Sequence, residues 1–147
     1  MRTPGTRHQA PGARARTART ARTALAVLLA VGALAACRVG LAESDRARQA
    51  AALTGGDPVR GQRLIRAYGC QTCHTIAGVD GADGLVGPPL TGIASRSYIG
   101  GVLPNAPANM VRWIQDPKRV DSLTAMPDMG VTPHDARDIA AYLYTLH

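Results

Sequence analysis

The sequence predicts an all-α fold, in which three to four helices form one small domain over residues 57–147. Apolar residues recur at helical spacing in three segments, each with a cap at its start and two of them with a proline after the cap, and no segment alternates as a strand would. Four tyrosines, one tryptophan and no phenylalanine make a thin apolar core. Domains of this size commonly need a staple or a bound group to be stable.

The first helix is predicted to begin after Asp57 and to end at Gly69. Asp57 is a good N-cap, and Pro58 suits the first helical position. Gly69 is a typical residue just past a helix C-terminus. Residues 78–89 are rich in glycine and contain two prolines, so they are predicted to form a long loop.

Two further helices follow this loop. One is predicted between Asn105, as its cap, and Pro117, which stops it. The last begins at Thr132-Pro133 with an acid at the third helical position, which is close to a capping box. Its predicted apolar stripe consists of Ile139, Tyr142, Leu143 and Leu146.

The N-terminal 36 residues are predicted to be an export signal. Residues 1–22 contain six arginines and no acid, and residues 23–36 contain no charged side chain. A helix of that uncharged segment would span about 21 Å, short of the roughly 30 Å hydrocarbon core of a bilayer. A basic segment followed by a short apolar one is typical of a signal peptide, which favours export over a buried core helix.

The signal ends in Leu34-Ala35-Ala36-Cys37, which resembles the lipobox of bacterial lipoproteins. This resemblance implies that Cys37 is lipidated and becomes the new N-terminus, so that the protein is periplasmic and anchored to the membrane by this lipid. An ordinary signal that ends in small residues next to a chance cysteine is the alternative. Residues 37–56 show little apolar periodicity and are predicted to be a flexible tether.

Removal of the signal changes the charge of the chain. Six of the 17 basic residues precede residue 23, and all ten acids lie beyond residue 42, so the net charge falls from +7 to about +1. Binding to nucleic acid would need basic residues clustered on a folded face, and the main support for it disappears with the signal. We expect a monomer that binds no nucleic acid.

The motif Cys70-Gln71-Thr72-Cys73-His74 follows the first helix. Two thiols separated by two residues can each add to one vinyl group of a haem, and the adjacent histidine then ligates the iron. A thioredoxin-type redox pair would need a βαβ context, and zinc would need four ligands in paired clusters. The motif therefore predicts one haem c, bound covalently through Cys70 and Cys73 and ligated by His74. A thiol–disulfide oxidoreductase is the less favoured alternative.

The second axial ligand is open from this motif alone, and methionine, histidine or an empty position are the candidates. Met126 lies in the loop before the last helix, where a ligand can approach the far face of the haem. Met129 is the runner-up, and Met110 is expected to pack within the second helix. Methionine opposite histidine raises the reduction potential and favours electron transfer over oxygen chemistry. The other two histidines of the domain are expected to be solvated.

Residues 57–147 resemble a small monohaem cytochrome c of the bacterial class I type. The resemblance rests on Gly61 in the helix before the haem motif, on Gly87-Pro88-Pro89-Leu90 as the Gly-Pro-x-Leu pattern, and on Met126-Pro127 before the last helix. It implies the small cytochrome c fold, with helices wrapped around one covalently attached haem that His74 and Met126 ligate.

The same resemblance implies roles for further residues. The carbonyl of Pro88 would accept the outer proton of His74, which is a usual way to orient a ligand. Gly61 would face Tyr142 where the first and last helices cross. Arg96, Tyr98 and Trp113 resemble the residues that hydrogen-bond the buried haem propionate in relatives. A cation, a phenol and an indole are all suited to binding a carboxylate. A surface arginine and ordinary core aromatics are the alternative.

These observations predict a single-electron carrier of a respiratory chain that is not an enzyme. The expected donor is a quinol-oxidising complex, and the expected acceptor is a haem–copper oxidase. A fixed haem c subunit of an oxidase or dehydrogenase complex is the alternative. Lys118 is the one lysine after the signal, so the basic docking face of the mitochondrial relatives is not obvious in this chain.

Overall fold

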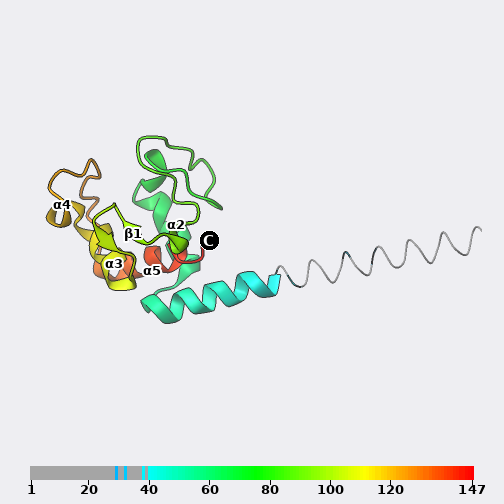
Figure 1. Cartoon of the computed structure of the whole chain (residues 1–147). Helices are drawn as coiled ribbons and strands as arrows, with labels where there is room; N and C mark the ends of the chain where they lie inside the picture. The colour runs from blue at the N-terminus through cyan, green and yellow to red at the C-terminus, as the bar shows by residue number, and fades with distance from the viewer. Residues whose placement is uncertain (1–28, 30–31, 33–37, 39) are drawn as a thin grey trace, which may run out of the picture. The chain divides into compact units, whose positions relative to one another are not determined.

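The computed structural model describes residues 29, 32, 38 and 40–147. The chain divides into two compact units, Met1–Leu41 and Ala42–His147, and the elements described below belong to the second. Helices dominate this unit (Figure 1), so the predicted all-α fold is confirmed. Among the described residues, none of the helices combines the length and the apolarity needed to span a bilayer.

Residues 40–54 are helical, where the sequence predicted a flexible tether. From Ala42 onward this helix belongs to the second unit. Ala50 and Thr54 are only 1% and 8% exposed, and Ala50 is part of the apolar core. Ala47 and Ala51 are half-buried, so four small residues at helical spacing form one packed face. Alanine side chains gave too weak an apolar pattern to predict this packing.

Helices α2 (Pro58–Ala67) and α5 (Pro133–Leu143) begin at the predicted caps. The Asp57 carboxylate accepts the backbone N–H groups of the first turn of α2, and Thr132 Oγ1 accepts the N–H of Asp135 at 3.2 Å. Gly69 follows α2 with a φ of 74°, a left-handed conformation that favours glycine. Both predicted starts are confirmed.

Helix α3 (Pro107–Gln115) does not use the predicted cap. Asn105 lies one residue too early, and the residue before the helix is Ala106, whose methyl group cannot accept a hydrogen bond. The amide of Asn105 is instead bonded to residues outside α3. A short helix, α4 (Pro117–Val120), follows where the sequence predicted only a stop, because the Asp116 carboxylate caps it.

Four small elements complete the second unit. Two are 3-10 turns, η1 (Cys70–Thr72) and η2 (Ile93–Ser95). The other two are strands β1 (Tyr98–Ile99) and β2 (Leu103–Pro104), which pair antiparallel with Ile99 opposite Leu103. The sequence predicted no sheet, and strands of two residues are too short to show an alternating pattern.

Helices α2 and α5 cross in close contact at Gly61. A Cβ at Gly61 would lie 1.9 Å from the carbonyl oxygen of Asp138 and 3.0 Å from the backbone nitrogen of Ile139. The expectation that Gly61 faces Tyr142 is therefore wrong, since Gly61 faces the backbone one turn earlier. Tyr142 instead donates its hydroxyl to the carbonyl of Ala77 at 2.6 Å.

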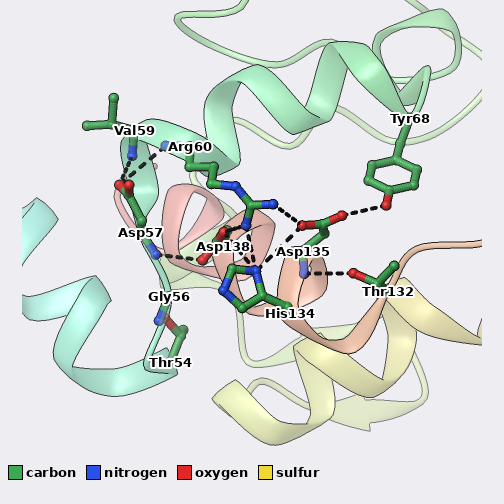
Figure 2. A network of polar contacts seen from close by, with 10 residues as sticks. All are labelled: Thr54, Gly56, Asp57, Val59, Arg60, Tyr68, Thr132, His134, Asp135 and Asp138. Atoms are coloured by element: carbon green, nitrogen blue, oxygen red, sulfur yellow. Dashed lines mark hydrogen bonds and ion pairs between the residues drawn. The ribbon is translucent and has the colours of Figure 1, made fainter.

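A polar network on one side of this crossing ties the two helices together (Figure 2). Arg60 of α2 forms ion pairs with Asp135 and Asp138 of α5, and the Tyr68 hydroxyl donates to Asp135 at 2.6 Å. His134 lies beside Arg60 with a side chain 68% exposed. Asp138 is only 3% exposed, so its carboxylate needs these partners. Helix α5 also packs against α3. The crossing therefore helps to hold α2, α3 and α5 in position around the cavity that all three line.

Candidate functional site

A cavity of about 550 Å³ lies in the second unit. Its walls come from α2, α3, α5, the hairpin and the loops on both sides of α3, and apolar side chains dominate them. The structure thus brings together segments that are up to 78 residues apart in the sequence, from Ile65 to Leu143. Every site residue predicted in the domain lines this cavity: Cys70, Cys73, His74, Pro88, Arg96, Tyr98, Trp113 and Met126.

The two cysteines lie on one wall, positioned by the turn that follows α2. Gly69 adopts a left-handed conformation, and η1, which begins at Cys70 and is followed by Cys73, brings both free thiols to the cavity. The backbone N–H of His74 donates to the carbonyl of Cys70 at 3.1 Å, which closes the turn. Burial, and then the neighbouring Cys73, raise the pKa of the Cys70 thiol. This is the reverse of the lowered pKa that activates a redox-active cysteine.

His74 reaches the same wall with a fixed ring orientation. Its Nδ1 donates to the carbonyl of Pro88 at 2.7 Å, so the lone pair of the imidazole lies on Nε2. The segment that supplies this carbonyl approaches the ring very closely, since a Cβ at Gly87 would lie 2.3 Å from Cε1 of His74. The arrangement leaves Nε2 as the nitrogen that could bind a metal.

Three methionines line the cavity. Met126 is half-buried and Met129 is 37% exposed, and both belong to the loop between α4 and α5. Met110 of α3 is 2% exposed and is part of the apolar core, as expected. The structure places both candidate thioether ligands at the cavity, so Met126 as the second axial ligand stays a prediction.

The residues expected near a propionate gather on the side of η2 and the hairpin. The Arg96 guanidinium donates to the carbonyl of Pro89 and, at 3.4 Å, to that of Thr91. Tyr98 is 59% exposed. The Trp113 ring packs over the hairpin turn, where a Cβ at Gly100 would lie 2.5 Å from it. All three line the cavity, and their role toward a propionate stays a prediction.

The sequence analysis missed one polar residue near the site. Asn105 was assigned to a helix cap, yet its amide links the turn at η2 to Tyr144 at the end of α5. A local pattern cannot show partners that are 39 residues away. The predicted lipidation site, Cys37, lies outside the described residues.

The residues of the cavity suit a haem. A planar macrocycle with an apolar body needs an enclosed apolar space, and two thiols beside an imidazole can attach its vinyl groups and bind its iron. Gly87 has no Cβ, which lets its backbone lie close to the imidazole ring of His74. Thioether sulfurs at the loop before α5 offer a second ligand of the kind found in cytochromes.

Comparisons with known proteins also indicate a haem-binding domain. The sequence model of the family described as cytochrome c matches residues 58–147, which include every residue that lines the cavity. Cytochrome c oxidase subunit 2 of Alkalihalophilus pseudofirmus is 32% identical over 90 residues, which cover 59% of this chain and 25% of that protein. The chain therefore spans about a quarter of the length of this curated relative.

Proposed function

The chain belongs to the cytochrome c family, and we propose that it is a periplasmic, membrane-anchored carrier of single electrons in a respiratory chain. Members of this family transfer electrons with a haem, and the cavity has the residues to hold one haem c. The single observation that carries the proposal is the wall on which both thiols and an oriented imidazole meet.

In this proposal the residues of the cavity have distinct roles. The two cysteines, Cys70 and Cys73, would hold the haem through thioether bonds. His74 would bind the iron through Nε2, while the carbonyl of Pro88 accepts the hydrogen bond from Nδ1. Met126 would supply the second ligand. When bound, the haem supplies one reversible electron through its iron. The chain itself sets the potential through its ligands, and it keeps water away with the apolar lining.

No catalysis on a substrate is part of the proposal. An enzymatic haem site needs an open coordination position on the iron, where a substrate can bind. In this proposal two side chains fill both axial positions, so none is open. A thiol–disulfide enzyme is the weaker alternative, because the pKa of the Cys70 thiol is raised by burial rather than lowered. A denaturing gel stained for haem separates the two, since thioether-linked haem stays with the chain.

Anchoring by a lipid on Cys37 is the second part of the proposal. It is supported by the basic and apolar segments before Cys37 and by the lipobox-like residues at their end. Confinement to the membrane surface would raise the effective concentration at membrane-bound partners. The proposed partners are a quinol-oxidising complex as donor and a haem–copper oxidase as acceptor.

A fixed haem c subunit of an oxidase or dehydrogenase complex is the alternative function. It is favoured by the similarity to a protein named as an oxidase subunit, although the match covers 25% of that protein. Purification from membranes in mild detergent distinguishes the two. A free carrier separates from the oxidase, whereas a subunit keeps a constant ratio to it.

The absorption spectrum of the matured protein tests the central proposal. We expect a low-spin haem c spectrum with one haem per chain, and complete loss of covalent haem in the double variant Cys70→Ala/Cys73→Ala. A colourless wild-type protein, or a high-spin ferric form that rapidly binds cyanide, would contradict an electron carrier with two axial ligands.

A further inference from the structure

The carbonyl that orients His74 lies in a segment with few backbone donors. Pro88 and Pro89 have no N–H group, so only their carbonyls can hold the middle of this segment by hydrogen bonds. Gly87 and Leu90, on either side, donate their N–H groups to backbone carbonyls at 2.8 Å each. The two ends are thus fixed by the backbone, and the prolines between them need a donor from elsewhere.

Arg96 supplies that donor. Its guanidinium donates to the carbonyl of Pro89 and, more weakly, to that of Thr91 at 3.4 Å. Pro89 is directly bonded to Pro88, so a shift of one carbonyl rotates the peptide that carries the other. The position of the Arg96 side chain therefore bears on the hydrogen bond that His74 makes.

Asn105 holds the backbone of Arg96 in place. Its Nδ2 donates to the carbonyls of Ile93 and Arg96 at 2.8 Å each, and its backbone N–H donates to that of Ser97 at 2.9 Å. Its Oδ1 accepts the hydroxyl of Tyr144, at the end of α5, at 2.8 Å. The amide thus uses both of its N–H bonds and its oxygen.

We propose that Asn105 is a positioning residue for His74. It fixes the turn that carries Arg96, and Arg96 fixes the prolyl segment whose carbonyl accepts the imidazole proton. An amide is needed because two carbonyls require a pair of donors and the phenol requires an acceptor. Aspartate would offer no donor and leucine would offer neither. The inference rests on the proposed function, in which His74 ligates the haem iron.

The test is Asn105→Ala in the haem-loaded protein. The first readout is the exchange of the His74 Nδ1 proton with solvent, followed by NMR on the reduced form. We expect exchange to accelerate by about fivefold or more, the equilibrium change that loss of one net hydrogen bond brings. The second readout is the reduction potential. It should rise, because a weaker bond from Nδ1 makes the ligand less basic.

Two control variants separate positioning from stability. Gln62→Ala removes an amide that donates to the carbonyl of Gly78 at 2.5 Å, from α2 and outside this chain of contacts, and should change neither readout. Tyr144→Phe removes the phenol from Asn105 but leaves both amide donors, so it should lower stability and leave the exchange rate unchanged. If Asn105→Ala does not fold, Arg96→Ala breaks the next link and must reproduce the faster exchange.

The outcomes are distinct from those of the proposed function. An Asn105→Ala protein with a normal haem spectrum and wild-type exchange and potential overturns the positioning role alone, and so does an Arg96→Ala protein in its place with wild-type exchange. Equal acceleration in Gln62→Ala or Tyr144→Phe also overturns it, since general loosening would then be the cause. A wild-type protein without haem would overturn the proposed function itself.

Discussion

Gly87 meets a requirement for space rather than for an unusual backbone conformation. A Cβ at this position would lie 2.3 Å from Cε1 and 2.6 Å from Nδ1 of His74. Gly87→Ala must therefore displace the imidazole or the carbonyl of Pro88. We expect a severalfold loss of haem-loaded protein, measured as the ratio of haem to protein absorbance. Gly40→Ala is the control, since its Cβ would have no described atom within 4 Å. Wild-type haem content in Gly87→Ala would contradict this.

The choice between Met126 and Met129 is a second question at the scale of single residues. Both line the cavity, and Met129 is the more exposed of the two. We expect Met126→Ala to lose the charge-transfer band of methionine sulfur and to have a lower reduction potential, because a thioether opposite histidine raises it. Met129→Ala should retain the band. The reverse result would assign the ligand to Met129.

The sequence predicts those site residues that lie close together in the chain and form a motif. Cys70, Cys73 and His74 form one short motif, and the structure places all three on one wall. Asn105 could not be found in this way. Its partners lie 9, 12 and 39 residues away, and its place before a helical segment suggested a cap instead.

At the scale of elements, the crossing of α2 and α5 depends on the absence of a side chain at Gly61. A Cβ there would lie 1.9 Å from the carbonyl oxygen of Asp138, which is backbone and cannot rotate away. We expect Gly61→Ala to lower the free energy of unfolding by about 1–3 kcal/mol, as overpacking does. Guanidinium unfolding followed by circular dichroism measures this. Val59→Ala, at a position 61% exposed, should stay within about 0.5 kcal/mol.

The polar network at the same crossing gives the fold a defined dependence on pH. The hydrogen bond from Tyr68, helped by Arg60, lowers the pKa of Asp135 to about 2, whereas the pKa of an aspartate in an unfolded chain is about 3.9. The stability from this group is therefore complete above about pH 4 and is lost as the pH falls toward 2. We expect Asp135→Asn to be less stable than wild type at pH 7, with a difference that shrinks over that window.

Urea unfolding midpoints at several pH values between 7 and 2 measure this effect. Tyr68→Phe is the matched variant, because it removes the leading hydrogen bond and keeps the carboxylate. It should reproduce part of the same pH dependence. A stability difference between wild type and Asp135→Asn that does not change with pH would show that packing, rather than ionisation of Asp135, is responsible.

Elements with local start signals could be predicted, and those held by distant contacts could not. Asp57 and Thr132 cap α2 and α5 through bonds within three residues, which a sequence pattern contains. The helix over residues 40–54 is held by close packing of small side chains, with Ala50 only 1% exposed. Alanine and threonine give little apolar contrast, so the same residues suggested a tether.

At the scale of the whole molecule, the small net charge is expected to do little to steer the protein toward a partner. The net charge beyond the predicted signal is about +1, and Lys118 is its one lysine. Long-range steering requires a strong field of one sign, so we expect little of it in this chain. Confinement near a membrane would serve the same purpose, because it raises the local concentration without requiring charge complementarity. The proposed lipid on Cys37 is therefore central to how such a carrier would find its partners.

Membrane attachment is tested by Cys37→Ser. Four residues separate Cys37 from the unit that begins at Ala42, so a lipid on Cys37 would be joined to this unit by a short segment of chain. We expect the variant to move from the membrane fraction to the soluble periplasmic fraction with unchanged haem content. Ala52→Ser, at an exposed position of the helix over residues 40–54, is the control and should stay with the membrane. If Cys37→Ser remains membrane-bound and its mass includes residues 1–36, the uncleaved apolar segment is the anchor.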